Sequence, residues 1–563
     1  MKKTIIIWIF IFILIAIIFE GVMRAQSGMP PLKAESRQFK YNYLDIHKKL
    51  YKKVREGGID RYVCQRQDYE EYEGFSAVRT FGSTRIFALG GSVAYNWNGC
   101  EDVQEKDFEI INCGMPGYDS YRVQIIAKEI LSYKPDLIIV LSGNNEFYPR
   151  QGFNPKIYYV NKFFSKFWAY RILQDYFLKL DNKSEFAFNR SREQMRLDYE
   201  KNIRLIVRNA KKKGVSVILC TLPVNFRDCP PLGRSPLDKQ FILARILLEN
   251  GNYLEAIDVF GKFSQDNPNN PLGYYFLGRT YDAMEKYQQA KENYLMSLEV
   301  SYRDDTATPS NNKTIRQICA EEEVGLVDLE KIFMDMAPHG LSGREQFLDH
   351  CHWWHEYYSL IDEAIVKEIF QNNAIYSKMF NSDRPKNRVV SSLPQFVFPS
   401  LAEFGKNQEY RDSITGNAVF NSIMNDNGLS ERAICHFKTL YLMSPNELWN
   451  LQFSRERIKE LFFDNKYLTE TILDNNFSQK QWPWVLYHIG ETYRRLKLYK
   501  EALVYFNNAI DLDEKNYLVY LGRALVYHAL GEKQKARESI YKAEEKSNSN
   551  SLEIRYYKEI LDL

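Results

Sequence analysis

The stretch Arg85-Ile-Phe-Ala-Leu-Gly-Gly-Ser92 decides the expected fold, because a short apolar run ends there in two glycines and a serine. The same pattern of apolar run, polar turn and amphipathic helix recurs along the chain. The expected strands are 85–89, 108–112, 136–141, 215–220 and 325–329, and the expected helices between them include 120–132 and 197–213. Strands that alternate with helices predict an α/β fold, with a parallel five-stranded sheet covered on both faces.

Three Gly-bearing polar turns follow the first three expected strands, and ligands of such sheets bind at the carboxyl ends of the strands. The first turn is no phosphate loop, because Val93, Ala94 and Tyr95 complete neither G-x-G-x-x-G nor a loop ending in Lys-Ser/Thr. A G-x-S-x-G elbow is excluded too, since position 94 is Ala. Ser92 therefore has two interpretations, a helix N-cap or an exposed nucleophile.

A histidine-rich loop favours the nucleophile. The chain has eight histidines, and three of them fall in Asp349-His-Cys-His-Trp-Trp-His355. This loop follows the last expected strand, where a base could reach a serine on the first strand. A metal site is the alternative for the same cluster, because His, Cys and Asp are all ligand types, although no established zinc spacing occurs.

Four blocks in order resemble those of the SGNH (GDSL-like) serine hydrolases, over about residues 81–235 and 304–375. They are Gly90-Gly91-Ser92, Asn112-Cys-Gly114-Met-Pro-Gly117, Gly143-Asn144-Asn145-Glu146 and Asp349-His-Cys-His352. The resemblance implies a flavodoxin-like sheet and an esterase. Gly91 and Glu146 depart from the family pattern, each replacing an Asp.

The resemblance also implies a role for each matched residue. Ser92 would be the nucleophile and His352 the general base, with Asp349 orienting the imidazole. The oxyanion hole would comprise the Ser92 amide, the Gly117 amide and the Asn145 carboxamide. It implies no metal and no cofactor.

Several neighbouring residues are candidates for the substrate cleft or for ordinary structure. Trp353 and Trp354 could form an aromatic wall, and Tyr148 and Arg150 could line the cleft or be plain loop residues. His350 and His355 are expected to be rim or core residues rather than second bases.

Helical repeats interrupt and follow the hydrolase pattern. Ala256 and Ala290 are 34 residues apart, as are Ala502 and Ala536, and 34 is the length of a tetratricopeptide repeat. Their aromatic and small residues are expected to form a solenoid core, and the solenoid surface to bind a protein partner.

The N-terminus carries an apolar run, Ile5 to Phe19, behind Lys2 and Lys3. An uncleaved membrane anchor and a cleaved signal peptide both fit, the latter with a small-x-small site at Ala25-Gln-Ser27. The positive side should stay cytoplasmic, so either interpretation places the remainder on the extracytoplasmic side.

Composition and charge exclude further classes of protein. A net charge of +3 in 563 residues lacks the basic excess of a nucleic-acid-binding surface. Aromatic residues make up 15%, which suits packed helices. Eight cysteines without C-x-x-C pairs indicate neither a zinc ribbon nor a disulfide scaffold, and most are expected to be buried thiols.

The resulting hypothesis is a membrane-anchored esterase that removes O-acyl groups, with O-acetyl groups the main expectation, from cell-envelope carbohydrate or lipid. An O-acyltransferase with the same triad and a non-catalytic repeat scaffold are the alternatives. The expected segments are an anchor 1–27, a juxtamembrane segment 28–80, hydrolase parts 81–235 and 304–375, inserted repeats 236–303, a linker 376–415 and terminal repeats 416–563.

Overall fold

The computed structural model describes residues 18–23, 25–26, 49–65, 74–79, 83–97, 108–146, 167–168, 170, 192–232, 236–301, 306–379, 399–423, 429–450, 482–547 and 551–562. The chain divides into two compact units. One comprises Met1–Val78 with Tyr148–Leu197, and the other Arg79–Phe147 with Asp198–Leu563. The expected hydrolase part 81–235 is therefore shared between the two units.

The first unit contains a small antiparallel sheet in the order β1-β2-β3. Its strands are β1 (Tyr51–Glu56), β2 (Ile59–Cys64) and β3 (Phe75–Ser76). Gly57 and Gly58 join β1 to β2, with φ of 56° and 84°. Two consecutive positive φ values fit a two-residue hairpin turn, which glycine adopts without strain. This sheet lies in the segment expected to be only juxtamembrane.

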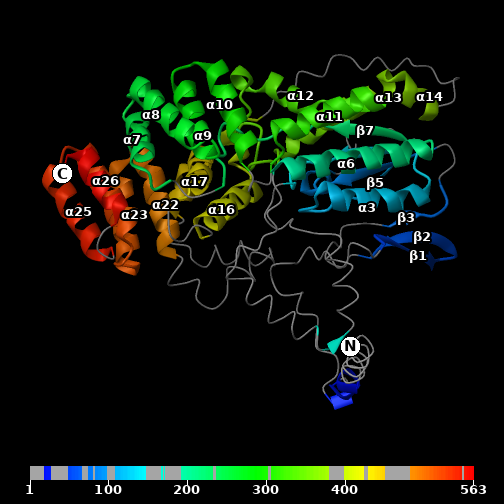
Figure 1. The fold of residues 1–563 in the computed structure, drawn as a ribbon, viewed down its shortest axis with the longest axis horizontal. Helices are drawn as coiled ribbons and strands as arrows, with labels where there is room; N and C mark the ends of the chain where they lie inside the picture. Colours follow the sequence, from blue (N-terminus) through cyan, green and yellow to red (C-terminus); the bar gives the residue numbers. More distant parts are fainter. Residues whose placement is uncertain are drawn as a thin grey trace, which may run out of the picture. The chain divides into compact units, whose positions relative to one another are not determined.

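The second unit contains a five-stranded parallel sheet, in the order β5-β4-β6-β7-β8, which confirms the expected fold class. Figure 1 shows strands of this sheet, among them β5 and β7, beside helices α3 and α6. The strands are β4 (Thr84–Gly90), β5 (Phe108–Asn112), β6 (Leu137–Leu141), β7 (Ser216–Cys220) and β8 (Gly325–Val327). Gly90 pairs with Leu141 and Ala88 with Asn112. This register brings the turns after β4, β5 and β6 to one edge of the sheet.

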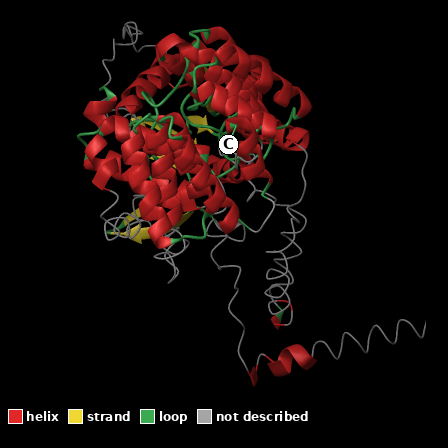
Figure 2. Ribbon diagram, turned by 90° about the vertical axis from the view of Figure 1, so that its left-hand side faces the viewer, coloured by secondary structure: helices red, strands yellow, loops and turns green. Residues whose placement is uncertain are grey.

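Helices cover the sheet, and Figure 2 shows them around the strands. The covering helices are α2 (Ser92–Tyr95), α3 (Ser120–Ile130), α6 (Arg192–Lys212), α11 (Pro309–Glu322) and α13 (Tyr358–Gln371), and a further helix, α12 (Leu329–Met336), follows β8. Ion pairs join α6 to α11, with Arg204 Nη2 2.7 Å from Glu321 Oε2. The Trp97 indole, just after α2, donates to Asp362 of α13 at 2.5 Å, which fixes the segment carrying Ser92.

Four helices between β7 and α11 occupy the part of the chain where the inserted repeats were expected. They are α7 (Lys239–Glu249), α8 (Tyr253–Asp266), α9 (Pro271–Ala283) and α10 (Tyr287–Val300). Ala256 and Ala290 are fully buried in their helices. The small side chains at the 34-residue spacing therefore mark close helix packing, as expected.

The C-terminal region is also helical. Its longer helices are α16 (Gln408–Ile423), α17 (Glu431–Met443), α22 (Trp482–Arg495), α23 (Tyr499–Leu512), α24 (Tyr517–Ala529), α25 (Lys533–Lys546) and α26 (Leu552–Leu561). The expected linker 376–415 is corrected in part, because α16 and the short α15 (Leu401–Phe404) occupy much of 401–415. Residues 380–398 of the expected linker are outside the described part.

A buried ion network joins the two sets of repeats. Arg245 of α7 lies 3.3 Å from Glu431 of α17, and Arg494 of α22 lies 2.7 Å from Glu249 of α7. Arg495 of α22 also pairs with Glu431, at 2.5 Å. Removing one partner of a buried pair leaves an uncompensated charge, so these contacts fix how the inserted and terminal repeats meet.

Two further expectations concern the cysteines and the N-terminal apolar run. Of the seven cysteines in the described part, six are buried thiols and Cys64 is half-buried, so most pack as small apolar residues. Within the described residues, the structure holds no helix with the length and apolarity of a membrane span. Most of the apolar run that begins at Ile5 lies outside those residues.

Candidate active site

Ser92 lies at the start of α2, directly beyond β4. Gly91, rather than Ser92, occupies the N-cap position of α2, and no side chain caps that helix. The Ser92 Oγ instead lies 2.7 Å from Nε2 of His352. Of the two interpretations of Ser92, the N-cap is wrong, and the hydroxyl faces a base as a nucleophile requires.

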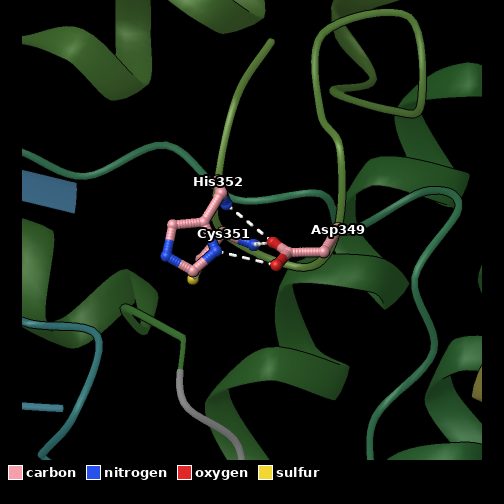
Figure 3. A group of neighbouring side chains, drawn as sticks. All are labelled: Asp349, Cys351 and His352. Carbon is pink, nitrogen blue, oxygen red and sulfur yellow. Dashed lines mark hydrogen bonds and ion pairs between the residues drawn. The ribbon is translucent and has the colours of Figure 1, made fainter. Parts of the chain in front are cut away.

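The loop that carries His352 is a tight hairpin. Phe347 and Trp353 form a β-bridge, and the Leu348 amide donates to the His352 carbonyl at 2.8 Å. Between them, Oδ1 of Asp349 accepts hydrogen bonds from the amides of Cys351 at 2.8 Å and His352 at 2.7 Å. Its Oδ2 lies 2.7 Å from Nδ1 of His352 (Figure 3). The carboxylate thus holds both the backbone and the ring of His352.

Asp349 is buried, and its charge sets the tautomer of His352. Burial by itself raises the pKa of Asp349, but the nearby charges of His352 and His350 and the hydrogen bonds from His352 outweigh it. The pKa of Asp349 is held well below its usual range, so the group is a carboxylate at neutral pH. The hydrogen-bond network therefore assigns a proton to Nδ1 of His352 and leaves Nε2 to accept the Ser92 proton.

Asn145 and Gly117 lie on the two neighbouring turns. A Cβ added to Gly91 would come within 2.6 Å of Asn145 Nδ2, so the carboxamide sits against the residue before Ser92. The same Nδ2 donates to Tyr118 O at 3.2 Å, which leaves its second N–H for a ligand. A side chain at position 91 would therefore have to displace the Asn145 carboxamide.

Gly117 has a φ of 72°, a conformation that glycine adopts without strain. Arg122 supports this turn from α3: its Nη2 donates to Gly117 O at 2.5 Å, and its Nε donates to Asp119 at 3.0 Å. Asp119 in turn caps α3 by accepting from the Arg122 amide at 3.1 Å. The turn that presents the Gly117 amide is therefore fixed by a buried Arg–Asp pair.

Glu146 ties the turn after β6 to the start of α3. Its carboxyl oxygens contact the Ser120 amide at 2.7 Å and the Ser120 hydroxyl at 2.8 Å, and Asn202 donates to the same hydroxyl at 3.0 Å. Burial, followed by repulsion from Asp119, raises the pKa of Glu146 to about 8. Glu146 is thus a mainly neutral carboxyl at pH 7 that holds the two turns together.

Replacing Glu146 with Gln should change how stability depends on pH. A raised pKa in the folded state means that the unfolded chain releases the proton first, so wild type should lose stability as pH rises from 4.5 to about 8. The loss should approach about 1.4 kcal/mol per pH unit within that window. Glu146→Gln mimics the neutral carboxyl and should remove this slope in thermal unfolding. Glu255→Gln, at an exposed site, should keep it. If the stability of wild type and of Glu146→Gln changed with pH in the same way, the raised pKa of Glu146 would be contradicted.

The metal alternative concerns Asp349, Cys351 and His352, whose potential ligand atoms lie within 4.8 Å of one another. The Cys351 Sγ is 3.8 Å from Nδ1 of His352 (Figure 3). Nδ1 is also hydrogen-bonded to Asp349, and Nε2 is hydrogen-bonded to Ser92. A metal at this group would have to displace the Asp349 contact, because both ring nitrogens of His352 already have hydrogen-bond partners.

The remaining candidates separate into core and surface. Trp353 is only 3% exposed and packs against Phe333, with ring centroids 5.6 Å apart, so its ring is in the core and is not the expected cleft wall. Trp354 is buried too, stacked on Phe404 at 4.5 Å. His355 is exposed, and His350 Nδ1 lies 3.6 Å from Asp349. Tyr148 and Arg150 lie outside the described residues.

Sequence reasoning missed three supporting residues: Arg122, Ser120 and Asn225. Asn225 donates through Nδ2 to the Asp349 carbonyl at 3.0 Å. The sequence could have indicated Asn225, because it follows the fourth expected strand and so lies at the same edge of the sheet as the other turns. Arg122 and Ser120 gave no signal, because they lie within the helical pattern that follows the second block.

Comparison with protein-family models supports the repeats. A family model described as tetratricopeptide repeat matches residues 273–302 and 485–516, so the chain contains such repeats in both the inserted and the terminal region. No curated protein matches the sequence.

Solved structures with similar folds include a GDSL-like lipase from Bacteroides thetaiotaomicron VPI-5482. It shows 13% identity over 51% of this chain and 88% of its own, with a TM-score of 0.26. A proposed acylhydrolase from Bacteroides fragilis NCTC 9343 shows 12% identity over 56% of this chain and 95% of its own, with a TM-score of 0.28. At these identities and TM-scores, the likeness says nothing of this chain's activity.

Proposed function

We propose that the protein is a serine acylhydrolase that cleaves O-acyl esters through Ser92, His352 and Asp349. The observation that supports this most is the unbroken chain of contacts, 2.7 Å from Ser92 Oγ to His352 Nε2 and 2.7 Å from His352 Nδ1 to Asp349 Oδ2. Two hydrogen bonds of this length, through one imidazole with a buried carboxylate behind it, are what activates a serine.

In the acylation step, Ser92 Oγ attacks the ester carbonyl carbon while Nε2 of His352 takes the hydroxyl proton. The carbonyl oxygen becomes an oxyanion, and the Ser92 amide, the Gly117 amide and the second N–H of Asn145 are the donors placed around it. The imidazolium is stabilised by the Asp349 carboxylate. It returns its proton to the departing alcohol as the C–O bond breaks, leaving an acyl group on Ser92.

In the second step, an acceptor hydroxyl attacks the acyl-serine while Nε2 of His352 removes its proton. The bond between the acyl carbon and Ser92 Oγ then breaks, and His352 returns the proton to Oγ. With water as acceptor the products are a carboxylic acid and free Ser92, which is hydrolysis. With a sugar hydroxyl as acceptor the product is a new ester, which is acyl transfer. We propose hydrolysis of O-acetyl groups on envelope carbohydrate or lipid, and transfer remains the alternative.

The full chain with p-nitrophenyl acetate tests this proposal. Wild type should release nitrophenol, and Ser92→Ala should not. Two further assays distinguish hydrolysis from acyl transfer. One supplies an acetylated glycan as substrate, and the other supplies a deacetylated glycan as acceptor for the acetyl group of the nitrophenyl ester. Free acetate from the first indicates a hydrolase, and acetyl transferred to the second indicates a transferase. Undiminished turnover after exhaustive chelation would support the triad over a metal. A folded wild type without any turnover would favour the scaffold alternative.

The apolar segment near the N-terminus supports a proposal about location, with the catalytic unit and the repeats on the extracytoplasmic side of a membrane. Lys2 and Lys3 precede the segment, which favours a cytoplasmic N-terminus. The repeats would dock a protein partner there. Carbonate extraction of membranes, followed by protease treatment of intact cells, tests the location. Release of the full chain by carbonate would contradict an anchor.

A further inference from the structure

The segment 225–230, here called the strap, follows β7 and runs along the loop that carries Asp349 and His352. The strap pairs by backbone with that loop at two places. The Asn225 amide donates to His350 O at 3.0 Å, and the Arg227 amide donates to Ser342 O at 3.1 Å. The strap therefore holds the loop both at its tip and near its start.

The side chain of Asn225 makes two further hydrogen bonds, one to the loop and one within the strap. It is buried, and its Nδ2 donates to Asp349 O at 3.0 Å. Its Oδ1 accepts from the Asp228 amide at 3.0 Å, which fixes the orientation of the carboxamide. Together with its backbone amide, Asn225 thus holds two consecutive carbonyls of the catalytic loop, those of Asp349 and His350.

Asp228 holds the base of the same loop. Its carboxylate accepts from the Arg344 amide at 3.2 Å and forms an ion pair with the Arg344 guanidinium. Arg344 O accepts in turn from the Trp354 indole at 2.9 Å. These contacts fix the two ends of the hairpin from one point on the strap.

The inserted repeats also hold the strap. The hydroxyl of Tyr275, on α9, donates to Arg227 O at 3.0 Å. Asp282, also on α9, lies 2.9 Å from Arg227 Nε. One residue of the strap is therefore fixed by two side chains from one helix of the inserted repeats.

The terminal repeats contact the strap as well, through α17. The Arg432 Nε donates to Pro230 O at 3.0 Å, and the Cys435 thiol donates to Asp228 O. Helices from both sets of repeats thus meet on a six-residue segment whose other side holds the catalytic loop.

We propose that the strap positions the Asp349–His352 pair, with Asn225 as the positioning residue, and that the repeats act on catalysis by holding the strap. The proposal rests on the proposed function for its catalytic consequence only. A shift of α9 or α17, such as a bound partner would cause, is transmitted to His352 through the strap rather than through the sheet.

Asn225→Ala tests the first part. Misplacing a catalytic pair by a fraction of an ångström is costly, so kcat should fall about 10- to 100-fold with KM little changed. The acid limb of the kcat/KM pH profile should also move. Asn421→Ala removes an equally buried carboxamide from α16, where Nδ2 donates to Asn417 O at 2.8 Å. It should lower stability comparably and leave kcat and the pH profile unchanged. Equal kinetics for Asn225→Ala and wild type would overturn the proposal.

Hydrogen exchange of the same variants is independent of any activity. Asn225→Ala should increase exchange at the amides of Leu348, Cys351 and His352, while Asn421→Ala should not. If wild type has no esterase activity, the proposed function fails, and exchange still decides whether the strap holds the loop. Unchanged exchange in Asn225→Ala would overturn the positioning role even in an active enzyme.

A double-mutant cycle tests the link to the repeats. Tyr275→Phe removes one hydroxyl from α9 and should lower kcat about two- to fivefold. Because Tyr275 and Asn225 act through one strap, their effects on kcat should combine less than additively. Tyr505→Phe removes a comparable hydroxyl bond, to Trp449 O at 2.9 Å, and its effect should be independent of Asn225. Additive effects for Tyr275 and Asn225 would overturn the coupling.

Discussion

Asp349→Asn should lower kcat about 10⁴-fold while the protein stays folded. The carboxamide oxygen can still accept from the amides of Cys351 and His352, so the hairpin keeps its backbone contacts. Its NH₂ group would then face Nδ1 of His352 and donate to it. That contact fixes the ring proton on Nε2, which can no longer accept the proton of Ser92.

Ester turnover and thermal unfolding of the same preparation measure this effect. Asp335→Asn is the matched control, because Asp335 is exposed and pairs only with Lys331 on α12 among the described contacts. It should leave both quantities unchanged. A loss of less than about tenfold in Asp349→Asn would show that the carboxylate does not set the tautomer of a catalytic His352.

Asn145→Ala should lower kcat about 10²- to 10³-fold, the usual effect of removing one oxyanion donor, or roughly 2.7–4 kcal/mol. Asn145→Asp keeps the size but loses the donor, and its charge repels the oxyanion, so its kcat should be as low or lower. Activity retained in Asn145→Asp would mean that the residue fills space and donates nothing.

Gly91→Ala should disturb the same donor, Asn145, without changing that residue. The new methyl group would displace the Asn145 carboxamide, whose Nδ2 lies 2.6 Å from the added Cβ. We expect a large loss of kcat with a small loss of stability, because the displaced atom ends a side chain. Gly261→Ala adds a methyl group in open space on α8 and should leave kcat unchanged. Equal activity of the two variants would contradict the placement of Asn145.

The sheet could be predicted because each strand is a local pattern, and the sheet in turn predicts which turns lie close together. The strands around Phe87 and Ile139 are continuous apolar runs, and the turns after them contain the residues that the register then aligns. A parallel sheet brings every such turn to one edge, so sequence order alone places Ser92 near Asn145.

Other features depended on tertiary contacts. Trp353 is next to His352 in sequence, yet its ring points into the core against Phe333, and no local pattern distinguishes a wall from a core residue. The strap needs α9 and α17, which come from distant parts of the chain. The hairpin at Gly57-Gly58 is different, since a Gly-Gly pair between two short alternating runs is a hairpin signal that the juxtamembrane interpretation passed over.

The central claim is that His352 activates Ser92, and covalent labelling of the full chain by a fluorophosphonate tests it most directly. The probe reacts only with an activated serine, and peptide mass analysis locates the adduct. Wild type should gain one adduct, on Ser92, and Ser92→Ala none, with His352→Ala labelled far more slowly than wild type. No labelling of folded wild type, or equal labelling of wild type and Ser92→Ala, would contradict the claim.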